Sequence, residues 1–90
     1  MHITVLRRTE YKGCPIYILR FGTVFQYIFY FRGDIYQSHI FMTPNLLPRI
    51  LYFLHLISDS RLYSKDEIED AEGTILNGAL SSIDKLTEAK

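Results

Sequence analysis

The chain has 90 residues, of which 48% are hydrophobic and 22% are charged. This composition is typical of a folded globular domain and excludes a disordered chain. The length leaves room for one hydrophobic core, so we expect residues 1–90 to form a single domain. The 10 Lys and Arg residues balance the 10 Asp and Glu residues. Proteins that neutralise many phosphates usually carry excess Lys and Arg, so this balance argues against a dedicated nucleic-acid-binding protein.

The cysteine content and the apolar segments indicate a cytoplasmic protein. Cys14 is the only cysteine, so the chain cannot form an internal disulfide. Residues 1–8 lack the charged start and the long apolar run of a signal peptide. The longest apolar stretch, residues 46–57, is interrupted by polar residues and is too short to span a bilayer. We therefore expect no membrane association.

Residues 3–42 are rich in β-branched and aromatic residues, and turn signals recur at Gly13, Gly22 and Gly33. Such residues favour strands between turns. The pattern predicts four strands, over residues 3–11, 16–21, 24–32 and 35–42. Short turns between consecutive strands imply an antiparallel meander. The charged residues at 7–10 interrupt the alternation of the first strand, so its place in the sheet stays open.

Alternation along the third and fourth strands assigns two faces to the sheet. We place the last turn at Gly33–Asp34, which pairs Phe31 with Tyr36. One face is strongly apolar and is predicted to be the core face: Phe25, Tyr27, Phe29, Phe31, Tyr36, Ser38, Ile40 and Met42. The other face is half polar and suits a partly wet surface or an interface: Gln26, Ile28, Tyr30, Arg32, Ile35, Gln37, His39 and Phe41.

The first predicted helix begins at Asn45 and continues to Ile57. An Asn can cap the free N–H groups of a helix, and Pro48 then falls within the first turn, where no internal bond is lost. Apolar residues surround this helix almost completely. A helix of this kind is usually buried on more than one side. We expect it between the sheet and the last helix, or against another subunit.

The last predicted helix has a clear start signal. Ser64 and Glu67 have the spacing of a capping box, and Tyr63 and Ile68 have that of a hydrophobic staple. Its buried stripe is predicted to comprise Ile68, Ala71, Ile75, Leu76, Ala79, Ile83 and Leu86. The predicted fold is α+β, a four-stranded antiparallel β-meander followed by two α-helices packed on one sheet face (ββββαα).

We expect no catalytic residue, cofactor site or metal site, and no enzymatic activity. Cys14 would need a base such as His39 to act as a nucleophile, and the sequence does not connect them. His2, His39 and His55 lie on different predicted elements without metal-binding spacing. The acidic run 66–72 lacks the pattern of a calcium loop and fits a helix start, whose dipole favours negative charge.

The function predicted from these patterns is a small non-enzymatic protein-interaction module, such as an adaptor, inhibitor or assembly factor. Its partner is another protein or a second copy in a homodimer, because apolar surface exceeds what one core needs. The candidate interface residues are Ile28, Tyr30, Arg32, Ile35, His39, Phe41, Tyr52, Phe53 and Leu56.

The less favoured alternative is a weak nucleic-acid-binding module that uses the half-polar face, where aromatic rings would stack on bases beside positively charged side chains. That module would use Tyr30, Phe41, Arg20 and Arg32, with Arg7 and Arg8 on the first strand.

Overall fold

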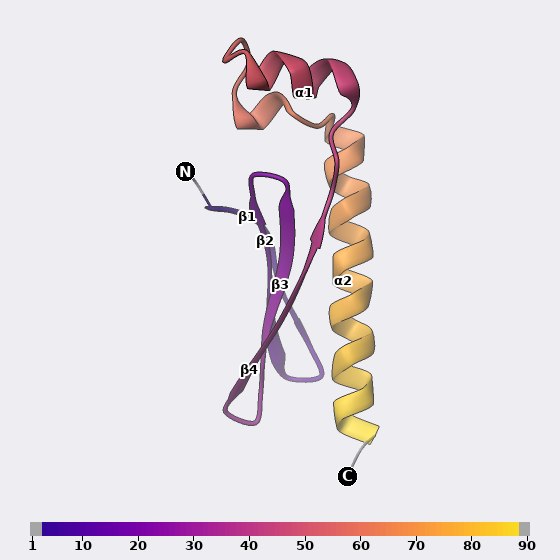
Figure 1. Cartoon of the computed structure of the whole chain (residues 1–90). Helices are drawn as coiled ribbons and strands as arrows, with labels where there is room; N and C mark the ends of the chain where they lie inside the picture. Colours follow the sequence, from indigo (N-terminus) through magenta and orange to yellow (C-terminus); the bar gives the residue numbers. More distant parts are fainter. Residues whose placement is uncertain (1–2, 89–90) are drawn as a thin grey trace.

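The computed structural model describes residues 3–88 and consists of a sheet followed by helices (Figure 1). Its elements are β1 (Ile3–Tyr11), β2 (Cys14–Phe21), β3 (Val24–Phe31), β4 (Asp34–Phe41), α1 (Leu46–Phe53), the 3-10 turn η1 (Asp59–Arg61) and α2 (Lys65–Glu88). The strands form a four-stranded antiparallel sheet in the order β1-β2-β3-β4. The predicted α+β class and the order of the elements are therefore confirmed.

The turn between β3 and β4 lies at Arg32–Gly33 and not, as predicted, at Gly33–Asp34. Both turn residues have positive φ, 51° and 85°, as a two-residue type I′ turn requires. Tyr36 consequently pairs with Phe29 and not with Phe31. The pairing is shifted by two residues, and side chains alternate with a period of two. The residues that stay within β3 and β4 therefore keep their predicted faces, whereas Arg32, predicted on the half-polar face, lies in the turn.

The core lies between α2 and one face of the sheet. On β2, buried residues alternate with more exposed ones, and Ile16 and Ile18 are fully buried. Phe25 and Phe29 of β3 are also fully buried, which confirms the predicted core face on β3. Ser38 and Ile40 of β4 were predicted on the same core face but are exposed, because α2 packs mainly over β1, β2 and β3. The side chains from α2 that close this core are Ala71, Ile75, Ala79 and Ile83.

The first strand pairs with β2 and forms one edge of the sheet. A register shift between Val5 and Arg7 marks a bulge. Within it, Leu6 packs against the buried core. The bulge explains why the alternation of this strand could not be read from the sequence, because a bulge inserts an extra residue into one strand.

The first helix differs from the prediction in its position and its length. It contributes no buried residue and lies beyond the end of the sheet, not between the sheet and α2 (Figure 1). Of the two helices, α2 alone therefore covers the sheet. The helix ends at Phe53 because His55 adopts a left-handed conformation with φ 61°. The N–H of Leu56 donates to the carbonyl of Leu51 at 2.8 Å, which closes the helix in a Schellman motif.

The predicted start of α2 is confirmed. The backbone N–H of Ser64 donates to Oε1 of Glu67 at 2.9 Å, and the N–H of Glu67 donates to Oγ of Ser64 at 3.2 Å. Tyr63 is buried, and its ring meets that of Phe25 edge to face at 5.6 Å. Ile68 packs against the same cluster. The capping box and the contacts of Tyr63 thus fix where the chain enters the long helix.

Candidate interaction surfaces

In the described residues 3–88, no helix lies over the face of the sheet opposite α2, which we call the outer sheet face (Figure 1). Directly paired residues share a face in an antiparallel sheet. The pairings place Ile3, Phe21, Val24 and Phe41 in one row across all four strands. Phe41 is 74% exposed and Ile3 is 65% exposed. This row is therefore a continuous apolar strip that is exposed to solvent.

Towards the β3–β4 turn, Tyr30 pairs with Ile35 on the same face, and both side chains are exposed. Between these two apolar rows the face is more polar. The Nε2 group of Gln26 donates to Oε1 of Gln37 at 2.9 Å. The His39 ring meets the Phe41 ring edge to face at 5.5 Å. The outer sheet face thus combines exposed rings with polar groups that can form hydrogen bonds.

The second apolar surface is α1 with the turn that follows it. Phe53 is 82% exposed, and Leu46, Leu47 and Leu56 are each more than half exposed. A hollow of about 370 Å³ lies along the helix, lined by Leu46, Arg49, Ile50, Phe53 and Leu54. A second, of about 460 Å³, is lined by Tyr52, Phe53, His55 and Ile57. An apolar side chain from another molecule could enter either hollow.

Most of the nine candidate interface residues are exposed, and Ile28 is half-buried. Five of them lie on the outer sheet face and three on α1 or its C-terminal turn: Ile28, Tyr30, Ile35, His39 and Phe41, then Tyr52, Phe53 and Leu56. Arg32 lies in the β3–β4 turn and not on the strand, with its guanidinium 5.0 Å from the centre of the Phe31 ring. That these residues form an interface stays a prediction.

The arginines of the nucleic-acid alternative do not gather on one face. Arg20 lies on the core face and is only 7% exposed, and its Nε donates to the carbonyl of Gly22 at 2.9 Å. Its guanidinium lies 4.9 Å from the centre of the Tyr63 ring. Arg7 faces α2 and pairs with Glu72 at 3.0 Å. Arg8 remains on the outer sheet face, paired with Tyr17.

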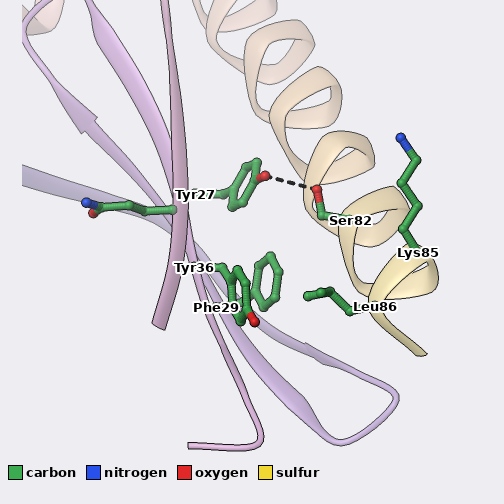
Figure 2. Close-up of a pocket in the computed structure, with 7 residues that line it drawn as sticks. Tyr27, Phe29, Tyr36, Ser82, Lys85 and Leu86 are labelled. Atoms are coloured by element: carbon green, nitrogen blue, oxygen red, sulfur yellow. Dashed lines mark hydrogen bonds between the residues drawn. The ribbon is translucent and has the colours of Figure 1, made fainter. Parts of the chain in front are cut away.

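A cleft that the sequence did not reveal lies between β3, β4 and the C-terminal half of α2 (Figure 2). It measures about 260 Å³ and is lined by Tyr27, Phe29, Tyr36, Gln37, Ser82, Lys85 and Leu86. The hydroxyls of Tyr27 and Ser82 lie 3.0 Å apart, and the rings of Phe29 and Tyr36 stack at 5.2 Å. The lining offers apolar contact but no thiol, imidazole or carboxylate, so it can hold an apolar group without supplying a base.

The alternation along β3 and β4 predicted that the rings of Tyr27, Phe29 and Tyr36 lie on the core face. Whether they line a cleft depends on how α2 crosses the sheet. Phe29 is fully buried, whereas Tyr36 on the edge strand is half-buried. No pattern in the sequence predicts that α2 leaves β4 partly uncovered. The cleft is therefore a consequence of packing and not of a motif.

Cys14 and His39 are not brought together. Cys14 belongs to the buried core on the α2 side, whereas His39 is exposed on the outer sheet face. His55 lies in the turn after α1, and His2 lies outside the described residues. Within residues 3–88, no three His, Cys, Asp or Glu side chains are grouped closely enough to hold a metal ion.

Two polar contacts tie the β1–β2 turn to the end of α2. The hydroxyl of Tyr11 donates to Oδ1 of Asp84 at 3.0 Å, and Nζ of Lys12 lies 2.6 Å from the same oxygen. The hydrogen bond from Lys12, then that from Tyr11, lowers the pKa of Asp84 below its ordinary value. The same bond raises the pKa of Lys12. At Tyr63, burial raises the pKa of the phenol. These groups hold elements together and do not face the cleft.

Comparisons of the chain with protein-family models, with curated proteins and with solved structures gave no match. In the part of the chain that the structure describes, no helix has both the length and the apolar character needed to cross a bilayer.

Proposed function

We propose that this protein is a non-enzymatic protein-interaction module that binds another protein through its outer sheet face, with α1 as a second contact. The observation that carries the proposal is the apolar strip of Ile3, Phe21 and Phe41, which crosses the sheet on the side without a helix. Burying apolar surface is the main favourable term in protein association. Large contiguous apolar patches on soluble proteins usually mark interaction sites.

The polar groups on the same face support a protein partner. Protein interfaces combine a ring-rich centre with polar groups at their rim, and Tyr, Phe and Arg are enriched in them. On the outer sheet face, Tyr30 and Phe41 supply rings, and Gln37 and His39 supply donors and acceptors. Phe53 on α1 adds an exposed ring on a different element. A partner that covers both elements gains specificity from their relative placement.

The test uses lysine substitutions on each surface. Ile28→Lys places a charge in the centre of the outer sheet face, and Phe53→Lys does so on α1. The matched control carries Thr74→Lys and Ser81→Lys, because both residues are exposed on α2. Each variant is used as bait in extracts of the native host, and captured proteins are quantified by mass spectrometry. Thermal unfolding by circular dichroism verifies that each variant is folded.

We expect wild type and the α2 control to capture the same protein in similar amounts. Ile28→Lys should capture at least about tenfold less of it, because burying an unpaired charge at an interface is costly. Phe21→Lys, in the apolar strip on β2 and 39% exposed, should give the same loss. If both sheet variants fold and capture the same proteins as wild type, the outer sheet face is not the interface and the proposal is wrong.

A further inference from the structure

The two edges of the sheet are protected against strand pairing to very different degrees. The β1 edge contains a bulge after Val5 and carries the charged residues Arg7, Arg8 and Glu10. Bulges and charged side chains are the usual means by which edge strands avoid pairing with other chains. The β4 edge, Asp34–Phe41, contains no Lys, Arg or Pro, and its pairing with β3 is regular throughout. Its one charge, Asp34, lies at the first position.

Residues of β4 alternate between bonding to β3 and facing the open edge. Phe31 and Asp34 close the two-residue turn, and the N–H of Met42 donates to the carbonyl of Thr23 at 2.9 Å. Even-numbered residues of β4 therefore direct their backbone groups to β3. The backbone groups that point away from the sheet belong to Ile35, Gln37, His39 and Phe41.

The chemistry of β4 is symmetric about Ser38. On the outer sheet face, Ile35 and Phe41 are apolar and equally distant from Ser38, and Gln37 and His39 are polar. On the α2 side, Tyr36 and Ile40 are apolar and equally distant from it. An antiparallel partner with the same sequence, centred on Ser38, would therefore place apolar beside apolar and polar beside polar at every position from 35 to 41. No two equal charges would be opposed.

We propose that β4 pairs antiparallel with β4 of a second copy of this chain, with the two-fold axis at Ser38, so that two sheets join into one. This inference deepens the proposed function by naming a second copy as a partner, but it uses the β4 edge and not the centre of the outer sheet face. In this register Gln37 bonds with His39 of the partner subunit, and Ile35 bonds with Phe41 of the partner subunit. All the outward-facing groups of β4 are then used, giving on the order of eight inter-strand hydrogen bonds.

Packing on the α2 side favours the same register. Ile40 is 36% exposed and Ser38 is exposed, because α2 lies over β1, β2 and β3 and leaves β4 largely uncovered. In the joined sheet, Ile40 of the partner subunit lies beside Tyr36, at the open side of the cleft in Figure 2. Both α2 helices lie on one face, and both outer sheet faces form one continuous surface on the other. Direct apolar pairs across strands add stability to such a contact.

The first test measures mass by light scattering on a sizing column over a dilution series. Wild type should form a dimer that dissociates on dilution. Ser38→Lys should weaken it by more than about tenfold, because like charges opposed in an interface are strongly unfavourable. Thr9→Lys, at an exposed position on the β1 edge, is the matched control and should leave the dimer unchanged.

The second test is a covalent trap in the folded protein. At a pair without mutual hydrogen bonds the Cα atoms lie about 4.5 Å apart, which a disulfide can bridge. Ser38→Cys should therefore give a linked dimer on mild oxidation. Asp34→Cys should not, because its two copies would lie roughly 27 Å apart. Wild type should also stay unlinked, since Cys14 is buried.

A monomer at every concentration without Ser38→Cys linkage would overturn the β4 dimer. A dimer that survives Ser38→Lys, or links equally through Asp34→Cys, would also overturn it. These outcomes leave the proposed function standing, because partner capture by the outer sheet face is tested through Ile28 and Phe21. Conversely, a β4 dimer whose Ile28→Lys and Phe21→Lys variants capture the same proteins as wild type would retain this inference and reject the outer sheet face as the interface.

Discussion

The two helices of this protein reverse the usual relation between composition and burial. The short helix α1, Leu46–Phe53, is almost entirely apolar and buries none of its residues. The long helix α2, Lys65–Glu88, is largely polar and buries a stripe that runs from Ala71 to Ile83. At about 1.5 Å per residue, α2 is long enough to follow the strands from end to end, and α1 is not. Burial is thus decided by where the chain places a helix over the sheet and not by how apolar it is.

The largest expected difference comes from removing a phenylalanine ring from the core beneath α2 and another from α1. Phe29→Ala should lower the free energy of unfolding by about 3–5 kcal/mol, because its fully buried ring meets α2 and leaves a cavity. Phe53→Ala on α1 should change it by no more than about 0.5 kcal/mol, because this ring is 82% exposed. Urea unfolding followed by circular dichroism measures both. Equal losses would mean that α1 is buried in solution.

The next largest difference is expected between the N-terminal caps of the two helices, in the stability that each cap side chain contributes. Ser64→Ala removes the hydroxyl that accepts from the N–H of Glu67 and should cost about 1 kcal/mol. Asn45 precedes α1 but forms no side-chain capping bond, so Asn45→Ala should stay within about 0.5 kcal/mol of wild type. The same urea titration compares them. A larger loss at Asn45 than at Ser64 would contradict the difference between the helices.

Filling a glycine in α2 should stabilise the protein slightly. Gly78→Ala should raise the free energy of unfolding by about 0.5–1 kcal/mol, because Ala favours the helix. Its new Cβ would lie 3.7 Å from Cε2 of Tyr27, an ordinary contact. Gly73→Ala is the matched control, because a Cβ there meets no atom within 4 Å. If Gly78→Ala destabilises while Gly73→Ala stabilises, α2 lies closer to Tyr27 than the structure shows.

The smallest expected effect concerns the exposed pair at the end of α2. The pKa of Asp84 is lowered by its bonds from Lys12 and Tyr11, so the pair adds stability above the unfolded pKa of about 3.9. This contribution disappears as pH falls through the folded pKa. Asp84→Asn should therefore be slightly less stable than wild type at pH 7 and equal to it in strong acid. Thermal unfolding across this range tests the convergence, and a difference that grows towards low pH would contradict it.

Local geometry made much of this fold predictable. Side chains alternate across a strand and recur every 3.6 residues on a helix, so the core face around Phe25 and Phe29 and the α2 stripe follow from the sequence. The capping box at Ser64 and Glu67 was predictable for the same reason, since its bonds span one helical turn.

The sequence by itself determined the four strands, the first two turns, the two faces of β3 and β4 and the start of the long helix, because these depend on residues close together in the chain. Only the tertiary structure decided the final register at Arg32–Gly33, the burial of Arg20 against Tyr63 and the exposure of α1. It also decided which strand stays uncovered, since that depends on how α2 crosses the sheet. The open β4 edge and the cleft beside Tyr36 exist because one long helix cannot cover all four strands.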